Sequence, residues 1–317
     1  MVKDKIVINK LELATRIVMP PMATNKGNYV SDELCKFYAE RSENDNVGLI
    51  ITEHSYVDKR GIASINQLSM ADDESIEGFS RLAKTIHEAG NTKAIVQINH
   101  AGGNADSGVF NDLCLAPSDM DYRKGKARSM TIEEINDVRN KFIDAAYRVK
   151  QCGFDGVEIH CAHGYLLNQF YSPLCNKRTD EYGCQNIENR TRLLIEIIKG
   201  VREKVGDDFV ISVRLGGCDY GYENGSTLQD CLSAAKLIKE AKADLLSLTG
   251  GLNGFVRKDA NYPGYFKDMS KIVKDNVDIT VLLTGGITSY EQAEQLLNEN
   301  VADLIGIGRA LLTNPNL

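Results

Sequence analysis

The sequence lacks three features that would each assign it to a particular class of protein: closely spaced cysteine pairs, a long apolar run and an excess of positive charge. Eight cysteines are present, but no two have the C-x-x-C spacing of zinc or iron–sulfur sites, so we expect reduced thiols in a cytoplasmic protein. No apolar run reaches the roughly 18 residues of a membrane span. The net charge of −7 makes nucleic acid and anionic membranes poor candidate partners.

The remaining composition is that of an ordinary globular protein. Hydrophobic residues make up 43% of the 317 residues, which is enough for a sizeable core. The N-terminal stretch MVKDKIVINKLELATRIVM is charged and broken by polar residues, unlike a secretory signal. No linker or repeat divides the chain, so we expect residues 1–317 to form a single domain.

Short apolar stretches alternate with helical patterns along the whole chain. The expected strands are residues 16–19, 48–52, 94–98, 154–159, 209–213, 244–248, 280–283 and 303–307. The capping boxes Thr131-x-x-Glu134 and Ser289-x-x-Gln292 mark the start of two of the helices between them. Eight alternating units predict an α/β fold of the (β/α)8 TIM-barrel type. Residues 6–13, before the first strand, are expected to form a hairpin across the barrel bottom.

Polar residues and glycines gather where the expected strands end, at the barrel edge that holds the chemistry in this fold. In chain order they are Glu53, His54, Gln97, His100, His160, His163, Tyr165, Arg214, Thr249-Gly250-Gly251, Thr284-Gly285-Gly286 and Gly306-Ile307-Gly308-Arg309. The glycines after the last two strands, ahead of a short helix from Arg309, are typical of a phosphate site. The convergence predicts a site for a large polar ligand.

Two connections on the same edge are longer than a barrel requires. Residues 101–130 follow the third strand, and residues 250–266 follow the sixth strand and carry Arg257, Tyr262 and Tyr265. Long ordered loops beside a site usually act as lids or determine specificity. Flexible decoration is the alternative interpretation.

His160, His163 and Tyr165 fall within six residues at the mouth of the fourth strand. Any one of them alone is compatible with ordinary packing, but two imidazoles and a phenol beside a buried strand need polar partners. The His-x-x-His pair also suits a metal ion. No third ligand with metal spacing is evident, so we expect no metal.

Several segments resemble the old yellow enzyme family of FMN-dependent oxidoreductases, in its bacterial NADH:flavin oxidoreductase and dienoyl reductase branch. They are IVMPPMAT at 17–24, QINHAG at 97–102, GFDGVEIHCAHGYLLNQFYSPLCNKRTDEYG at 153–183, ENR at 188–190, VRLG at 213–216 and IGRALLTNP at 307–315. The segment at 153–183 is long and highly specific. The resemblance spans residues 13 to 315.

The resemblance implies FMN as cofactor and assigns residues to it. Gln97 is expected to hydrogen-bond the pyrimidine edge of the flavin, and Arg214 to lie against N1 and O2, where a permanent cation favours the reduced form. The full expected cofactor set is Pro20, Pro21, Met22, Ala23, His54, Gln97, Arg214, Gly250, Gly286, Gly308 and Arg309.

The resemblance also implies a reaction, in which hydride from NADH or NADPH passes through FMN to the activated C=C bond of an α,β-unsaturated carbonyl compound. His160 and His163 are expected to donate hydrogen bonds to the substrate carbonyl and to stabilise the enolate that develops. Tyr165, with an ordinary pKa near 10, is protonated at neutral pH and is expected to protonate the α-carbon. A homo-oligomer is possible.

Other functions are kept as alternatives. A flavin barrel with another electron acceptor (an NADH oxidase or flavin reductase) and a catalytically silent flavin-binding protein both fit the cofactor residues. A barrel of the tRNA dihydrouridine synthase type would need a basic surface and a cysteine acid in place of Tyr165. A phosphate-sugar aldolase or isomerase would need a rim lysine or paired carboxylates.

The sequence departs from the family pattern at its end and at Ala23. The chain stops at Leu317, where relatives usually continue into a final barrel helix, so we expect a short or missing C-terminal helix. The four-cysteine iron–sulfur motif and second nucleotide-binding domain of longer relatives are absent from this sequence. Electrons are therefore expected to reach FMN directly from soluble NAD(P)H.

Ala23 stands where many relatives carry a threonine or cysteine that hydrogen-bonds flavin O4. An Ala23→Thr variant should raise the midpoint potential of the bound flavin, because the new donor stabilises the electron-rich reduced form. Reductive titration against a reference dye measures this potential. An unchanged potential would count against the alignment of this segment.

Overall fold

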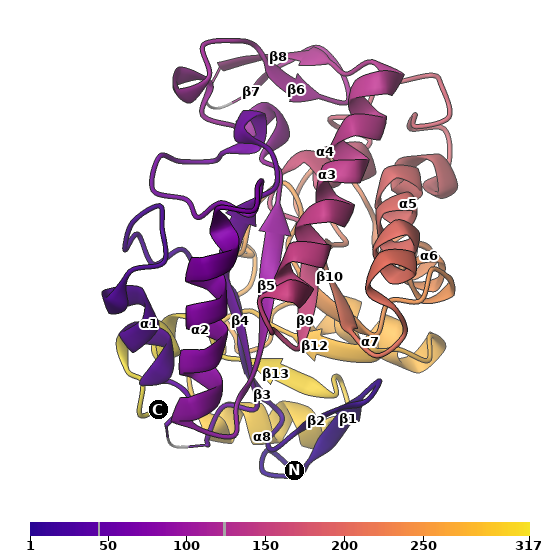
Figure 1. The fold of residues 1–317 in the computed structure, drawn as a ribbon. Coiled ribbons are helices and arrows are strands. Elements are labelled where there is room, and N and C mark those ends of the chain that lie inside the picture. Colours follow the sequence, from indigo (N-terminus) through magenta and orange to yellow (C-terminus); the bar gives the residue numbers. More distant parts are fainter. Residues whose placement is uncertain (44, 123–124) are drawn as a thin grey trace.

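The computed structural model describes residues 1–43, 45–122 and 125–317, and its centre is a closed barrel of parallel strands (Figure 1). The barrel strands are β3 (Ile17–Met19), β4 (Leu49–Tyr56), β5 (Lys93–Asn99), β9 (Gly156–Cys161), β10 (Val210–Gly216), β11 (Leu245–Thr249), β12 (Thr280–Leu283) and β13 (Leu304–Gly306). They are neighbours in this same order around the barrel, and β13 pairs with β3 to close it. The predicted TIM barrel is confirmed.

Helices surround the barrel in the connections between its strands (Figure 1). They are α1 (Asp32–Ala39), α2 (Ser75–Ala89), α3 (Ile132–Gln151), α4 (Leu166–Tyr171), α5 (Ile187–Val205), α6 (Leu228–Glu240), α7 (Lys267–Asn276), α8 (Tyr290–Asn298) and α9 (Arg309–Thr313). The helix α9 covers five residues and is the short helix expected to begin at Arg309.

The two predicted capping boxes differ in the structure. At the start of α3 both halves form, because Thr131 accepts the Glu134 N–H and the Glu134 carboxylate accepts the Thr131 N–H. At the start of α8 the Ser289 hydroxyl accepts the Gln292 N–H. The Gln292 side chain, however, accepts the N–H of Thr288, one residue earlier than a capping box requires.

The lower half of the barrel interior is a closed apolar plug. Its buried members are Ile8, Leu13, Val18, Leu49, Ile51, Ile95, Val210, Leu245, Leu282 and Leu304. Ile8 and Leu13 come from the predicted hairpin, which is observed as β1 (Ile6–Ile8) paired with β2 (Leu11–Leu13) at the bottom of the barrel (Figure 1). Any ligand must therefore enter from the opposite, carboxyl end of the strands.

Strand β4 is longer than predicted and contains a bulge. Thr52 pairs with Val96 and Ser55 pairs with Ile98, so two residues of β4 lie opposite the single residue between them on β5. A bulge adds one residue to a strand and redirects the side chains that follow. The apolar pattern stops at Thr52, which is why the sequence predicted the strand to end there.

The connection at 101–130 contains a small sheet, which corrects the expectation of a plain loop. Strands β6 (Cys114–Ala116), β7 (Met120–Tyr122) and β8 (Gly125–Ser129) form it in the order β6-β8-β7. It lies beyond the carboxyl end of β5 (Figure 1). Residues 123–124 of this connection are outside the described residues. Strands of three to five residues are too short to show alternation in the sequence.

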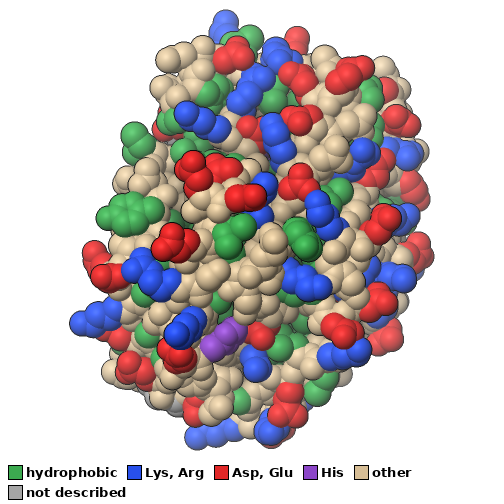
Figure 2. All heavy atoms as spheres, viewed as in Figure 1, with side chains coloured by type: hydrophobic (Ala, Val, Ile, Leu, Met, Phe, Trp, Pro, Cys, Tyr) green, Lys and Arg blue, Asp and Glu red, His purple; other side chains and the backbone are tan. Residues whose placement is uncertain are grey.

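The surface mixes charges of both signs. Figure 2 shows lysine and arginine side chains interspersed with aspartate and glutamate over the face that it presents. Across the described residues, none of the helices combines the length and the apolar character needed to cross a bilayer.

Candidate active site

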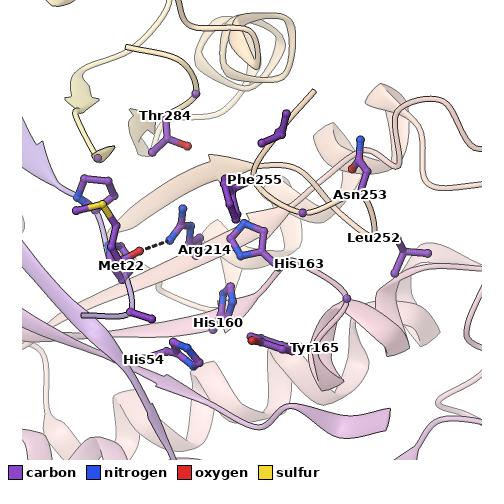
Figure 3. A pocket seen from close by; sticks show the side chains of 18 of the residues that line it. Met22, His54, His160, His163, Tyr165, Arg214, Leu252, Asn253, Phe255 and Thr284 are labelled. Carbon is purple, nitrogen blue, oxygen red and sulfur yellow. Dashed lines mark hydrogen bonds between the residues drawn. The ribbon is translucent and has the colours of Figure 1, made fainter. Parts of the chain in front are cut away.

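A cavity of about 980 Å³ opens at the carboxyl end of the barrel strands. Figure 3 shows its side chains converging from different strands. The residues predicted for the site that line it are Pro20, Pro21, Met22, Ala23, His54, Gln97, His160, His163, Tyr165, Arg214, Gly286, Gly308 and Arg309. The structure therefore brings together in one place segments that lie almost 300 residues apart in the sequence.

Three other predicted residues are placed differently. Gly250 is missing from the described lining of the cavity, and a Cβ there would lie 2.1 Å from the Gly254 carbonyl oxygen, so the residue permits a close chain crossing. His100 is buried, and its Nδ1 accepts the N–H of Gly102. Arg257 pairs with Asp268 at 2.9 Å and braces its loop.

A tight turn carries His160 and His163 to the same side of the cavity. His163 has φ +59° and Gly164 has φ +71°, so two consecutive residues adopt the left-handed conformation. Such a conformation is uncommon for a residue with a side chain and is found at functional sites. The His160 ring centroid lies 5.0 Å from that of His163 and 5.3 Å from that of Tyr165.

Buried amides hold this turn in place. The Gly164 N–H donates to Asn168 Oδ1 at 2.9 Å, and the Gly164 carbonyl accepts from Asn104 Nδ2 at 2.8 Å and Gln169 Nε2 at 2.7 Å. Asn168 and Gln169 are fully buried on α4. Sequence reasoning assigned these amides no role, although two of them lie in the most specific segment of the resemblance.

The two histidines are neutral. Burial lowers the pKa of His160 and of His163 well below the ordinary value, and the positive charge of Arg214 lowers both further. A neutral imidazole carries one N–H donor. Nε2 of His163 lies 3.1 Å from Thr249 Oγ1, and Nδ1 of His160 is buried without a protein partner.

Arg214 is a buried cation at the inner end of the cavity. Its Nη1 donates to the Pro21 carbonyl at 3.3 Å, shown as a dashed line in Figure 3, and its Nε has no protein partner. Burial lowers its pKa, and the charge of Glu158 opposes that shift. Glu158 is fully buried and accepts from Gln97 Nε2 at 2.9 Å and from Ser212 Oγ at 2.8 Å.

The sequence pattern did not lead us to assign a role to Glu158. It precedes His160 by two residues on β9, and side chains two apart on a strand point to the same face. The presence of an acidic residue inside an otherwise apolar strand could have identified Glu158 as part of the site. Its contact with Gln97 directs the amide nitrogen of Gln97 toward the carboxylate, which leaves the Gln97 carbonyl oxygen available to a ligand.

The residues of this half of the cavity fit FMN. An unpartnered arginine nitrogen and the Gln97 amide match the polar edge of a flavin. At the other end, Gly285 and Gly286 have φ +113° and +69°, and a Cβ on either would collide with the Tyr265 ring at 2.7 Å. These turns bring the backbone close to the cavity beside Arg309. An anionic phosphate binds where backbone N–H groups and a positive charge lie close together.

The outer wall of the cavity is mainly apolar. Met120 comes from β7, and Leu252, Phe255 and Val256 come from the connection at 250–266. Phe255 is 59% exposed. The Asp219 carboxylate anchors this connection by accepting the Leu252 N–H at 2.8 Å.

The cysteines remain thiols in the structure. Within the described residues, no two of the eight cysteines form a disulfide. Within the described part of the chain, no group of three or more histidine, cysteine, aspartate or glutamate side chains is arranged to hold a metal ion.

Comparison with known proteins gives a consistent result. The model of the NADH:flavin oxidoreductase / NADH oxidase family matches residues 5–317. An NADH oxidase of Thermoanaerobacter brockii is 37% identical over 319 aligned positions, which cover 97% of this chain and 48% of the relative. The chain thus spans about half the length of this curated relative.

Solved structures share the barrel. A 2-naphthoyl-CoA reductase in complex with 2-naphthoyl-CoA superimposes with a TM-score of 0.92 at 27% identity, over 99% of this chain and 51% of the other. An old yellow enzyme homologue from Zymomonas mobilis superimposes with a TM-score of 0.85 at 25% identity, over 99% of this chain and 90% of the other.

Replacing Glu158 by glutamine should destabilise the protein by about 2 kcal/mol, because the buried carboxylate that accepts from Gln97 and Ser212 and offsets the Arg214 charge is lost. Urea unfolding of the cofactor-free protein measures the loss. Glu12→Gln, which removes the exposed partner of Lys5, is the matched control and should leave the midpoint nearly unchanged. Equal midpoints for the two variants would contradict a stabilising role of the Glu158 carboxylate.

Proposed function

Because the chain belongs to the NADH:flavin oxidoreductase / NADH oxidase family, we propose that it is an FMN-dependent reductase that transfers hydride from NADH or NADPH to an activated C=C bond. The observation that carries this proposal is the convergence of His160, His163 and Tyr165 on the cavity that also holds Arg214. Two histidines that can polarise a substrate oxygen and a tyrosine that can donate a proton therefore line the same cavity as the residues that fit the flavin.

The family match confirms two predictions, the resemblance to flavin-dependent oxidoreductases and FMN as cofactor. The family description names NADH as reductant, and the choice between NADH and NADPH in this chain stays open. The single-domain organisation, the cytoplasmic location and a homo-oligomer stay predictions.

In the proposed enzyme, one half of the cavity binds the cofactor. Arg214 and Gln97 hold the pyrimidine edge, with Arg214 supplying a charge that favours electron-rich states of a bound ring. Gly286, Gly308 and Arg309 hold the phosphate. When bound, FMN supplies the hydride carrier that links NAD(P)H to the substrate.

The other half acts on the substrate. Neutral His160 and His163 each donate one hydrogen bond to the substrate carbonyl oxygen, and these bonds strengthen as negative charge develops on it. Tyr165 delivers a proton to the α-carbon from the phenol hydroxyl. A positioned general acid of this kind contributes about 10²–10⁴-fold to the rate.

The outer wall favours an extended apolar substrate. Met120, Leu252 and Phe255 offer contacts for hydrocarbon, beside the polar side chains of Asp121 and Asn253. One structural neighbour is solved with an aromatic thioester, 2-naphthoyl-CoA, which supports the same substrate character. We therefore propose bulky enones, including aromatic ones, as the substrate class.

A second candidate function is that of an NADH oxidase, in which oxygen takes the electrons. It is favoured by the relative from Thermoanaerobacter brockii, which carries that name at 37% identity. The two functions share the cofactor half of the cavity and differ only in the acceptor.

The test is an anaerobic spectral titration of the purified, FMN-loaded protein. NADH should bleach the visible flavin bands, and 2-cyclohexenone should restore them without oxygen. Restoration by oxygen alone would favour the oxidase function. Failure to bind FMN would refute both functions.

Tyr165→Phe should slow re-oxidation of the flavin by the enone by about 10²–10⁴-fold, since the proton donor is lost. Flavin reduction by NADH should stay nearly unchanged, and stopped-flow absorbance separates the two half-reactions. Tyr147→Phe removes an exposed phenol from α3 and serves as control. A Tyr165→Phe enzyme that re-oxidises at the parental rate would exclude Tyr165 as the acid.

A further inference from the structure

His54 is the one histidine of the cavity whose tautomer the surrounding protein determines. Glu53 and His54 are the two bulge residues of β4, opposite Gln97 on β5. The bulge turns His54 to the cavity, where its ring lies 5.7 Å from that of Tyr165 and 6.4 Å from that of His160 (Figure 3). Bulges commonly redirect a side chain beside an active site.

Gln67 decides which nitrogen of His54 carries the proton. The Ala63 N–H donates to Gln67 Oε1 at 2.6 Å, so that atom must be the amide oxygen. The other end of the amide is then the NH2 group, and it lies 2.8 Å from Nδ1 of His54. An NH2 group only donates, so Nδ1 must accept, and the ring proton must sit on Nε2.

Neighbouring groups reinforce this arrangement. Asn99 Nδ2 lies 3.2 Å from the same Nδ1 and is a second donor to it. Burial lowers the pKa of His54 to about 4, and the charge of Arg214 contributes to the shift. The imidazole is therefore neutral around pH 7 and has a single N–H, on the side of the ring away from Gln67.

The side chains of the adjacent cavity wall provide few hydrogen-bond donors. Pro20 and Pro21 have no N–H, and the side chains of Met22 and Ala23 have no polar hydrogen. Thr24 hydrogen-bonds to the Glu53 carboxylate through both its N–H and its hydroxyl, which ties the residue after Ala23 to the residue before His54. A ligand with a carbonyl on this side would be matched by His54.

We propose that Gln67 locks His54 as an Nε2–H donor to the carbonyl edge of bound flavin next to Ala23. The inference rests on the proposed function for the presence of FMN. Gln67 does not line the cavity in the described chain, so it is a positioning residue that acts through His54. A donor at a flavin carbonyl stabilises the electron-rich reduced form and raises its midpoint potential.

The tautomer itself can be read without cofactor. Nitrogen-15 NMR of the FMN-free protein at pH 7 should show a pyridine-type Nδ1 and a protonated Nε2 for His54. The signals are assigned by their loss in His54→Phe. A protonated Nδ1 would overturn the proposal whether or not the protein proves to be a flavin enzyme.

The acceptor is identified from the flavin. His54→Phe should weaken binding of reduced relative to oxidised FMN about tenfold, which corresponds to a midpoint potential lower by about 30 mV for a two-electron couple. His54→Gln, which retains an amide donor near the Nε2 position, should restore most of the difference. An unchanged potential with weaker binding of an enone analogue would make the substrate the acceptor, and the flavin assignment would be wrong.

Gln67→Leu tests whether Gln67 fixes the tautomer of His54. It should allow the second tautomer in the NMR spectrum and lower the potential in the same direction as His54→Phe, by a smaller amount because Asn99 still donates to Nδ1. Gln292→Leu is the matched control, since the Gln292 side chain also accepts a backbone N–H but lies on α8 outside the cavity. Identical spectra and potentials for Gln67→Leu and the unaltered protein would refute the positioning role.

Discussion

The buried charge of Arg214 controls the chemistry of the whole cavity. Together with burial, it keeps His54, His160 and His163 neutral, so that each offers one directed N–H rather than a diffuse positive charge. The cation is itself tolerated in the barrel interior because Glu158 lies one layer below it. Burial is thus the main cause of the lowered pKa values of the three imidazoles, and the Arg214 charge lowers all three further.

The barrel separates mechanical support from chemistry along its axis. Below, the apolar plug that includes Ile8 and Leu13 of the β1–β2 hairpin excludes water. In the middle, the Glu158 carboxylate accepts hydrogen bonds from Gln97 and Ser212. Above it, groups without protein partners, such as Arg214 Nε and His160 Nδ1, face ligand positions.

Periodicity and motifs were enough to predict the barrel, its strand order and thirteen residues of the cavity lining. The reason is that the carboxyl ends of all strands in this fold meet at the same rim of the barrel. The β4 bulge could not be predicted from the sequence, since the shift of register depends on pairing with β5. The tautomer of His54 depends on Gln67, thirteen residues away, and on a backbone N–H. Such contacts produce no periodic pattern in the sequence from which they could be predicted.

The outer wall is built from two segments that lie outside the barrel strands, one of which also packs Tyr265 against the Gly285–Gly286 turn of the flavin half. Met120 belongs to the β6–β8–β7 sheet, and Phe255 belongs to the connection after β11, whereas the cofactor contacts come from strand ends. Insertions or substitutions in these two segments can alter the shape of the entrance while Arg214 and Gln97 stay in place. The architecture is therefore suited to evolutionary diversification, in which one redox core is retained and new acceptors are acquired by remodelling two peripheral segments.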